Sequence, residues 1–521
     1  MPKVKNFFYP LIVFLFAFSL YIFSIKSPLI ADESYFIQRN QVTSLANSLS
    51  LFNKKDYDGY YYRPLPDFIS GISTLTFKYN VPCYRLLNNL LHATAAVLVY
   101  YFFLLLLNDN PKKKLIALFA ALFFACFPLH DYAVIWLTDL FERVMIIFYL
   151  AGLIAFIRKR FKPGFFSMLF FALSLLSKEM AFSFPLIIGL LYFYFGEKKY
   201  NLKKSINALL PYVIIMAAFI LIRIILFNND VFTARDAHST GTLIDVVKNY
   251  FIFTGLLVFP FFLREMQSFL LMHKFFAAII GIAAATGFAF IFFRRKKKNA
   301  LVLFFILFII LTIAPASRLM MRWYLYLPSV GFTGLISYLI FSINIKQLRL
   351  PVIVSISLLI VYSIALIHEE TNWVKYSQES ITALKEFIKQ NRSEIESTRQ
   401  AEFLTIPAKI NDIPVFQLAF DKLFNFYFDD STRINIKVDS KSYLNNFADQ
   451  VYLSSNKNGI RLRQTDNNYF ILFNNGKSIN FAKDKNRNNK IKSLTFNKSE
   501  LKNKILYTFS NGKFYKITGV E

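Results

Sequence analysis

Two adjacent carboxylates, Asp32 and Glu33, lie directly after the first apolar run of the chain, in the segment "ADESYFIQRN". A carboxylate at this position could act as a general base toward a hydroxyl group, or it could bind a divalent cation such as Mg²⁺ or Mn²⁺. The alternative is an ordinary solvated pair of acids at the end of a helix. We therefore treat Asp32 and Glu33 as candidate catalytic residues, with the metal as an open alternative.

Two further segments carry arginines suited to phosphate. Arg63 follows Tyr62 in "GYYYRPLPDF", where two prolines stiffen the backbone, and Arg318 and Arg322 are four residues apart in "PASRLMMRWYLYLPSVGF". The planar guanidinium group donates two parallel hydrogen bonds to a phosphate or a carboxylate. An aromatic belt with snorkelling arginines, or anchoring to lipid headgroups, is the alternative.

Ionisable residues also interrupt strongly apolar stretches. His130 and Asp131 lie in "FPLHDYAVIWLTDLFERV", and Lys178 and Glu179 lie in "LLSKEMAFSFP". Ionisable groups at membrane depth are expensive, so they usually face a partner or a cavity. We interpret these residues as lining a site, and structural ion pairs are the alternative. The first of these stretches also carries Asp139, Glu142 and Arg143.

The composition sets the class of protein that must position these groups. The 521 residues contain 60 Lys+Arg and 32 Asp+Glu, a net charge of +28, and 55% are hydrophobic. A soluble enzyme of this composition would expose large apolar patches, and a chain with 62 Phe is not disordered. The two cysteines exclude a disulfide framework and a cysteine-based zinc site. Despite the charge, the long apolar runs argue against a nucleic-acid partner and predict a polytopic α-helical membrane protein.

About eleven apolar runs are predicted to cross the membrane. We interpret the first, 7–25, as a span rather than a cleaved signal peptide, because no A-x-A site follows it. The run at 249–263 is predicted to be re-entrant or interfacial, because the basic clusters then all face the cytoplasm. The predicted spans are 7–25, 86–107, 115–130, 133–157, 164–177, 179–195, 208–227, 275–293, 300–316, 323–342 and 350–367.

The distribution of charge predicts a cytoplasmic N-terminus and an outward C-terminal region. Of the acidic residues in 1–368, only Asp109 and Glu197 fall in predicted cytoplasmic loops. Acidic residues do not set topology, so this bias has another cause. Either the longest loops simply face outward, or the chemistry takes place on the outer side.

Three regions follow from the composition. Residues 1–368 are predicted to form the transmembrane domain, with the first outer loop at about 26–85. Residues 369–399 form a polar connecting helix, and 400–521 form an extracytoplasmic β-rich domain.

Asn-Gly pairs punctuate the C-terminal region at 458–459, 475–476 and 511–512. Asn-Gly favours the type I′ turn of a two-residue hairpin, which predicts an antiparallel sheet.

Six segments in order resemble the GT-C superfamily of polytopic glycosyltransferases, most closely the protein O-mannosyltransferases and the transmembrane transferases with tetratricopeptide repeats. These segments are "DESYFIQRN", "YYRPL", "LLNNLLHATAAVLVY", "FPLHDYAVIW", "LLSKE" and "RWYLYLPSVGF". The resemblance implies transfer of a sugar from a polyprenyl-phosphate carrier to an acceptor hydroxyl of a protein, glycan or lipid on the extracytoplasmic face. Direct displacement would invert the anomeric centre.

The resemblance also implies roles for individual residues. Asp32, with Glu33 beside it, would be the catalytic carboxylate. The residues expected around the carrier phosphate or the sugar are Tyr62, Arg63, His130, Asp131, Lys178, Glu179, Arg318 and Arg322. Two features depart from the family: Tyr132 stands where a His-x-Glu pattern has Glu, a role that Asp131 could assume, and the tetratricopeptide array is missing.

Two other interpretations remain open. A polytopic transporter or lipid flippase would also have many spans and buried charges, and a catalytically silent scaffold would present the C-terminal domain. The usage of Phe, Lys, Asn and Ile resembles that of an AT-rich bacterial genome, which predicts the bacterial inner membrane and places the C-terminal domain in the periplasm.

Overall fold

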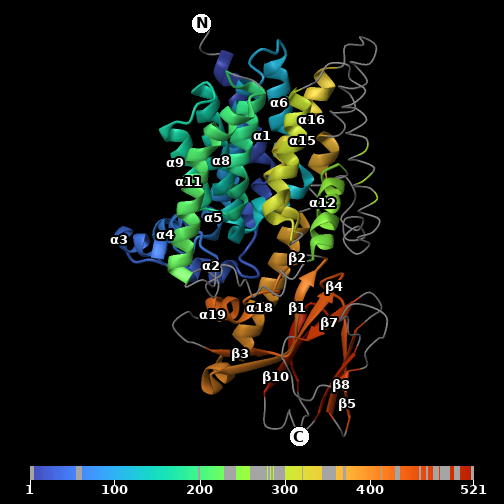
Figure 1. Ribbon diagram of the computed structural model, residues 1–521. Coiled ribbons are helices and arrows are strands. Elements are labelled where there is room, and N and C mark those ends of the chain that lie inside the picture. The colour runs from blue at the N-terminus through green and yellow to red at the C-terminus, as the bar shows by residue number, and fades with distance from the viewer. Residues whose placement is uncertain are drawn as a thin grey trace. The chain divides into compact units, whose positions relative to one another are not determined.

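A computed structural model of the chain divides into two compact units, which are described separately (Figure 1). The first unit comprises Met1–Ile22 and Val42–Glu370, and the second comprises Phe23–Gln41 and Thr371–Glu521. The structure describes residues 5–53, 61–197, 200–227, 242–258, 279, 282, 286, 300–318, 321–342, 360–365, 367, 371–411, 413–428, 434–456, 459–464, 468–472, 480–481, 493–497 and 505–517.

The first unit is built from apolar helices, of which α1, α5, α6, α8, α15 and α16 pack side by side (Figure 1). Its longer helices are α1 (Lys5–Leu20), α4 (Pro64–Phe77), α5 (Val81–Leu106), α6 (Lys113–Ala125), α8 (Leu140–Arg158), α9 (Phe165–Leu175), α10 (Phe184–Phe195), α11 (Leu202–Phe227), α12 (Leu243–Val258), α15 (Ala300–Ile313) and α16 (Pro328–Phe341). Its shorter helices are α3 (Leu45–Ser48), η2 (Leu49–Asn53), η4 (Pro128–His130), α7 (Asp131–Ile135), η5 (Leu137–Asp139), η6 (Glu179–Ser183), η7 (Ala314–Ala316) and η8 (Arg322–Leu325).

Glycine allows α16 to approach its neighbours closely. A Cβ at Gly334 would lie 2.3 Å from the ring of Phe103 on α5, and one at Gly331 would lie 2.7 Å from Phe308 on α15. Small residues at helix interfaces are typical of helices that associate inside membranes, where burial of apolar surface from water does not drive their contact.

The described helices include several that could cross a membrane. Three are long and apolar enough, namely Val81–Leu106, Leu137–Arg158 and Leu202–Leu226. A fourth is present if Lys113–Ala125 and Pro128–Ile135, which are bent by 48°, form one span. Shorter apolar helices are Phe7–Leu20, Phe165–Leu175, Glu179–Phe195, Ala300–Ala316 and Pro328–Phe341.

The mostly helical architecture with a β-rich C-terminal region is therefore confirmed, whereas the count of eleven spans stays a prediction. The predicted spans at 275–293 and 350–367 fall mostly outside the described residues, as does the end of the run at 249–263.

Extended residues interrupt the helices at the positions where the ionisable side chains occur. Phe127, which precedes Pro128, has φ −66° and ψ 121°, because proline disfavours a helical conformation in the residue before it. Trp136 is also extended (φ −69°, ψ 125°), as is Lys178 between α9 and η6 (φ −165°, ψ 148°). These breaks hold His130, Asp131 and Lys178 at helix ends rather than within regular helices.

The second unit combines helices and two sheets. Its helices are α2 (Glu33–Arg39), α18 (Thr371–Thr398) and α19 (Phe420–Phe428), and its strands are β1 (Gln400–Ile410), β2 (Ile413–Pro414), β3 (Asn435–Val438), β4 (Ser440–Leu444), β5 (Val451–Asn456), β6 (Gly459–Gln464), β7 (Tyr469–Leu472), β8 (Asn480–Phe481), β9 (Ser493–Asn497), β10 (Leu506–Ser510) and β11 (Lys513–Ile517). One more short helix, η1 (Ile22–Lys26), lies where the two units join along the chain.

The larger sheet of the second unit is mixed, which corrects the prediction of an antiparallel sheet. Among the described residues it has seven strands, and β1 pairs in parallel with β3, β4 and β10. Parallel pairs require crossover connections, and α19 lies in the connection from β1 to β3. The smaller sheet, with the order β5-β6-β9-β8, is antiparallel.

The Asn-Gly signal is confirmed at one turn. Asn511 (φ 47°) and Gly512 (φ 74°) join β10 to β11, and two consecutive positive φ angles define a type I′ turn. The pair at 475–476 and the first residue of the pair at 458–459 lie outside the described residues, although β5 and β6 pair as an antiparallel hairpin.

A cluster of aromatic rings forms the core of the second unit. The ring of Phe403 on β1 lies 5.3 Å from Phe420, 5.9 Å from Phe424 and 5.7 Å from Phe514, measured between centroids. The ring of Phe387 on α18 lies 5.6 Å from Phe403. Edge-on contacts of this kind add about 0.5–1.5 kcal/mol per pair beyond the area they bury, so they fix α18 and α19 on the sheet.

Candidate functional site

A half-buried carboxylate, Glu179, binds two arginines that are distant from it in the sequence. Arg63, at the N-terminus of α4, donates from Nη2 and Nε to Oε2 of Glu179 at 2.8 and 3.1 Å. Nη1 of Arg223 on α11 lies 3.5 Å from the other oxygen, Oε1. This group therefore has one more positive charge than negative.

The neighbouring residue Lys178 has the opposite balance. Its Nζ lies 2.6 Å from Oε1 of Glu142 and 3.9 Å from Oδ1 of Asp139. Its side chain is only 4% exposed and that of Glu142 is fully buried, while the ring of Tyr324 on η8 lies 4.8 Å from the ammonium group. One ammonium faces two carboxylates here, so this group carries an excess negative charge.

The two groups are parts of one network, because Lys178 and Glu179 are consecutive in the chain. We call Arg63, Asp139, Glu142, Lys178, Glu179 and Arg223 the ion network. The excess positive charge on one side and the excess negative charge on the other cancel. Burying ionised groups costs several kcal/mol each unless they are paired, so this balance is what allows the network to be buried.

A second ion pair lies beside the network. Nη2 of Arg322 is 2.7 Å from Oδ2 of Asp131, whose side chain is fully buried. The guanidinium carbon of Arg322 also lies 3.9 Å from the ring centroid of Tyr132. Tyr132 thus supplies an aromatic face to Arg322, and Asp131 supplies the carboxylate. Arg322 and Tyr324 belong to the same turn, η8, which links this pair to the ion network.

His130 lies in an aromatic cage. Its ring lies 4.5 Å from that of Tyr326 and 4.8 Å from that of Phe124, between centroids. Its Nε2 lies 2.9 Å from Oγ of Ser329, and this hydroxyl donates to the carbonyl of Tyr326 at 2.8 Å. The hydroxyl proton of Ser329 is donated to that carbonyl, so its oxygen can only accept from His130. Nε2 of His130 therefore carries a hydrogen and donates it to Ser329.

His92 on α5 has its hydrogen bonds assigned in the same way. Its Nε2 faces the carbonyl of Ala125 at 3.1 Å and must donate, and its Nδ1 accepts from the hydroxyl of Tyr326 at 2.8 Å. Both histidines are thus anchored through Tyr326, and they support the break between α6 and α7.

Arginine side chains hold the short helix α7 in place. Arg143 donates to the carbonyls of Ala133 and Trp136, and to Oδ1 of Asn88 at 2.8 Å. Arg85 donates to the carbonyl of Ile135 at 2.7 Å. Carbonyls at the C-terminus of a helix have no partners within it, so these buried cations satisfy them.

Asp32 and Glu33 belong to the second unit and are described with it. Oε2 of Glu33 accepts from the backbone N–H of Ile30 at 2.9 Å, so this carboxylate closes the turn that begins α2. Ala31 has φ 50°, a left-handed conformation that costs about 1–2 kcal/mol for a residue other than glycine. Its N–H donates to the carbonyl of Val415 at 2.8 Å, which ties the turn to the C-terminal region.

The remaining predicted residues have distinct environments. Arg318 is exposed, whereas Arg322 is mostly buried and paired with Asp131, so the two arginines have different environments. Tyr62 is buried, and its ring lies 6.1 Å from that of Phe219 on α11. The structure thus brings Arg63, Lys178 and Glu179 together in the ion network.

The sequence interpretation did not identify Arg223, His92 or Tyr324. Arg223 is a single charge near the end of an apolar helix, which is also typical of a snorkelling side chain. Arg223 is only 8% exposed, which distinguishes a buried partner of Glu179 from a snorkelling side chain. The sequence signal that could have identified Arg223 was its position as a lone ionisable residue inside an apolar run.

Within the described part of the chain, no group of three or more His, Cys, Asp and Glu side chains is arranged to hold a metal ion. Asp139 and Glu142 lie beside the same cation, the ammonium group of Lys178, rather than beside a metal ion.

Scans of the chain against protein-family models and against curated proteins return no match.

Proposed function

We propose that this chain is a multi-pass membrane glycosyltransferase that moves a sugar from a polyprenyl-phosphate carrier to an acceptor hydroxyl on the extracytoplasmic face. The observation that carries the proposal is the ion network, in which Arg63 and Arg223 share the single carboxylate of the half-buried Glu179. A structural role alone would be served by one-to-one pairs. Across the whole network the charges cancel, but the two guanidinium groups make the side around Glu179 locally positive, which favours an anion such as phosphate there.

The phosphate of the donor would supply that anion. As the bond between the anomeric carbon and the phosphate oxygen breaks, negative charge builds on the phosphate. Arg63 and Arg223, with Arg322 beside them, would stabilise this charge, and fixed donors are most effective at a site sheltered from water. The sugar hydroxyls would then accept or donate hydrogen bonds at Asp139, Glu142 and Tyr324.

Asp32 is our candidate for the base. The acceptor oxygen attacks the anomeric carbon, its proton passes to the Asp32 carboxylate, and the phosphate leaves with the bonding electron pair, so the anomeric centre inverts. Glu33 would act as a positioning residue, because its carboxylate is bound to the backbone N–H of Ile30. Backbone strain such as that at Ala31 is typical of turns that hold a functional side chain in place.

The proposal includes the membrane topology that the charge distribution predicts. The chain would cross the bacterial inner membrane about eleven times, with a cytoplasmic N-terminus and a periplasmic C-terminal domain. The acceptor would be a protein, a glycan or a lipid, and the C-terminal domain would take part in its capture.

A lipid flippase is the second candidate, and the broken helices favour it. The chain bends by 48° between α6 and the η4–α7 segment, and interrupted helices are typical of transporter binding sites. A flippase would move the carrier lipid without breaking the bond to the sugar. Product analysis therefore separates the two functions.

The test is turnover of polyprenyl-phosphate sugars by the purified full chain in lipid nanodiscs. We expect release of the carrier phosphate, a loss of about 10²–10⁴-fold for Asp32→Asn, and a loss of about 10²-fold for Arg63→Gln. Asp421→Asn and Arg160→Gln, at acidic and basic positions that are more exposed than Asp32 and Arg63, are the controls. Equal turnover in Asp32→Asn would refute the base, and movement of intact donor across a vesicle bilayer would favour the flippase.

A further inference from the structure

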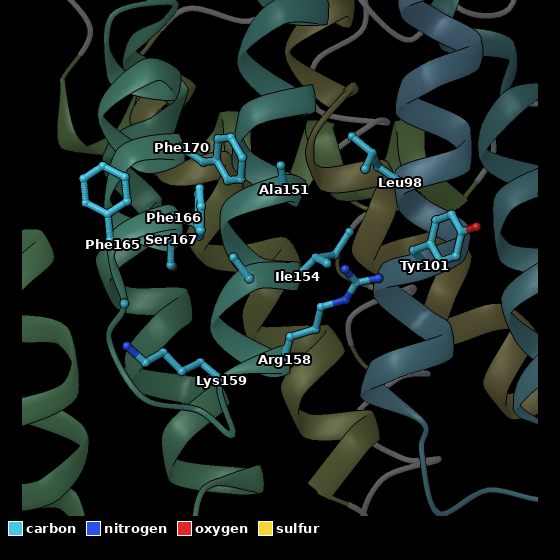
Figure 2. A pocket seen from close by; sticks show the side chains of 12 residues that line it. Leu98, Tyr101, Ala151, Ile154, Arg158, Lys159, Phe165, Phe166, Ser167 and Phe170 are labelled. Carbon is cyan, nitrogen blue, oxygen red and sulfur yellow. The ribbon is translucent and has the colours of Figure 1, made fainter.

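A groove of about 660 Å³ lies between α5, α8 and α9 in the first unit (Figure 2). Its walls are mostly apolar, with aromatic rings from two of the helices. The lining includes Leu98, Tyr101, Ala151, Ile154, Phe166 and Phe170. The volume is within the range of about 300–1,000 Å³ that is typical of small-molecule sites.

Two cations lie at one end of the groove. Figure 2 shows Arg158 and Lys159 at that end, with Ala151, Phe170 and Leu98 toward the other. Both cations are exposed, and among the described residues neither has a carboxylate within 4.0 Å. By contrast, the nearby Lys162 is paired with Glu197 at 2.8 Å. Within the described part of the chain, the two cations at the groove therefore differ from Lys162 in having no carboxylate partner.

The backbone adds positive potential at the same place. Gly164 lines the groove and is the N-cap of α9, an eleven-residue helix. A Cβ on Gly164 would lie 3.2 Å from Nζ of Lys159, so the ammonium group sits against the N-terminus of this helix. The N-terminus of a helix carries a partial positive charge, which repels a cation and attracts an anion. The ammonium group of Lys159 adds to this positive potential, so the place favours an anion.

The groove is separate from the ion network, although α8 contributes to both. Glu142 lies in the first turn of α8, and Arg158 is its last residue. Their residue numbers differ by 158 − 142 = 16, which corresponds to about 24 Å along the helix axis. The cationic end of the groove is therefore nearly one hydrocarbon thickness away from the proposed reaction site.

We propose that this groove binds one anionic phospholipid. The phosphate lies between Arg158 and Lys159 at the N-terminus of α9, and an acyl chain follows Ile154, Ala151 and Phe170. The charge of the rim selects an anionic headgroup over a zwitterionic one, and the length of the apolar wall selects a lipid over a soluble phosphate. Phe165 and Phe166, which are 68% and 64% exposed, flank the groove, as aromatic side chains do at a membrane interface.

Native mass spectrometry of the purified full chain with palmitoyl-oleoyl phosphatidylglycerol tests the proposal. In Arg158→Gln/Lys159→Gln, the affinity for this lipid should fall about 30-fold, because each basic side chain near an anionic headgroup contributes a factor of about five. Arg160→Gln/Lys162→Gln removes the same charge from the same cluster away from the groove, and we expect it to retain wild-type affinity. Thermal unfolding of each variant verifies that it is folded.

Two further lipids separate the sources of affinity. Palmitoyl-oleoyl phosphatidylcholine should bind at least about tenfold more weakly than phosphatidylglycerol, and so should the short-chain dihexanoyl phosphatidylglycerol. Equal loss in both double variants would mean a diffuse effect of surface charge and would overturn the site. Equal binding of phosphatidylcholine would overturn the role of the cations, and equal binding of the short-chain lipid would overturn the role of the apolar wall.

Discussion

Removal of the Lys178 ammonium group should destabilise the first unit more than removal of either carboxylate that it faces. Nζ of Lys178 is the cation that separates Glu142, at 2.6 Å, from Asp139, at 3.9 Å. Lys178→Met would leave both carboxylates buried without it, whereas Glu142→Gln leaves Lys178 beside Asp139. Breaking a buried pair by removing one partner costs about 3–5 kcal/mol, because the other charge stays buried.

The magnitude for each variant follows from this arrangement. We expect Lys178→Met to lower the free energy of unfolding by about 3–5 kcal/mol, and Glu142→Gln by about 1–2 kcal/mol. The double variant Lys178→Met/Glu142→Gln should be more stable than Lys178→Met alone, because only Asp139 then lacks the ammonium. The coupling between the two positions should exceed about 1 kcal/mol, which is typical of residues in one ion network.

The assay is equilibrium unfolding of the full chain in mixed micelles, followed by tryptophan fluorescence. Trp136 and Trp323 report on the first unit, and Trp373→Phe removes the signal of the second unit. A matched control is Lys162→Met, because Lys162 forms an exposed pair with Glu197 that should contribute about 0–1 kcal/mol. Additive effects at the two positions, or a Lys178→Met chain as stable as the wild type, would refute the network.

Three other predictions follow from the packing and electrostatics. Gly334→Ala should destabilise the first unit by about 1–3 kcal/mol, because its Cβ would lie 2.3 Å from the ring of Phe103, and a lower unfolding temperature in detergent would show it. Gly512→Ala should destabilise the second unit by about 1–2 kcal/mol, because φ is 74°, and Trp373 fluorescence during urea unfolding measures it; unchanged stability would contradict the turn assignment. Burial lowers the pKa of Lys441 from its ordinary value to about 8, partly offset by the charge of Asp421. Since the unfolded chain binds the proton more tightly, the stability of the second unit should rise from pH 8 to about 10.5, and Lys441→Met should remove this rise and stabilise the unit at pH 7 by about 1–3 kcal/mol.

The sequence was informative where a local pattern has one physical cause. The density of apolar residues predicted a helical unit, and the change of composition near residue 368 predicted the β-rich region. The pair Asn511-Gly512 predicted its turn, because few other residues accept two positive φ angles. Charges inside apolar runs predicted buried partners, and Lys178 does face Glu142.

Long-range pairing could not be predicted in the same way. The pair Arg63–Glu179 is separated by 116 positions, and no local pattern indicates which arginine this carboxylate will bind. The parallel strands joined to β1 were missed, because turn residues mark hairpins and not crossovers. The predicted first outer loop, about 26–85, begins within the segment Phe23–Gln41, which the structure groups with the C-terminal region.

This grouping sets an order of events during synthesis of the chain. The turn that holds Asp32 is tied to residues made much later, since Ala31 donates to Val415 and Ser27 lies 3.1 Å from Ser377, hydroxyl to hydroxyl. The ribosome must add 415 − 31 = 384 residues after Ala31 before its bond to Val415 can form. At about 5–20 residues per second this interval lasts roughly 20–80 s. The candidate base is therefore placed only after Val415 has been made, so a chain terminated before that residue would lack the turn that positions this carboxylate.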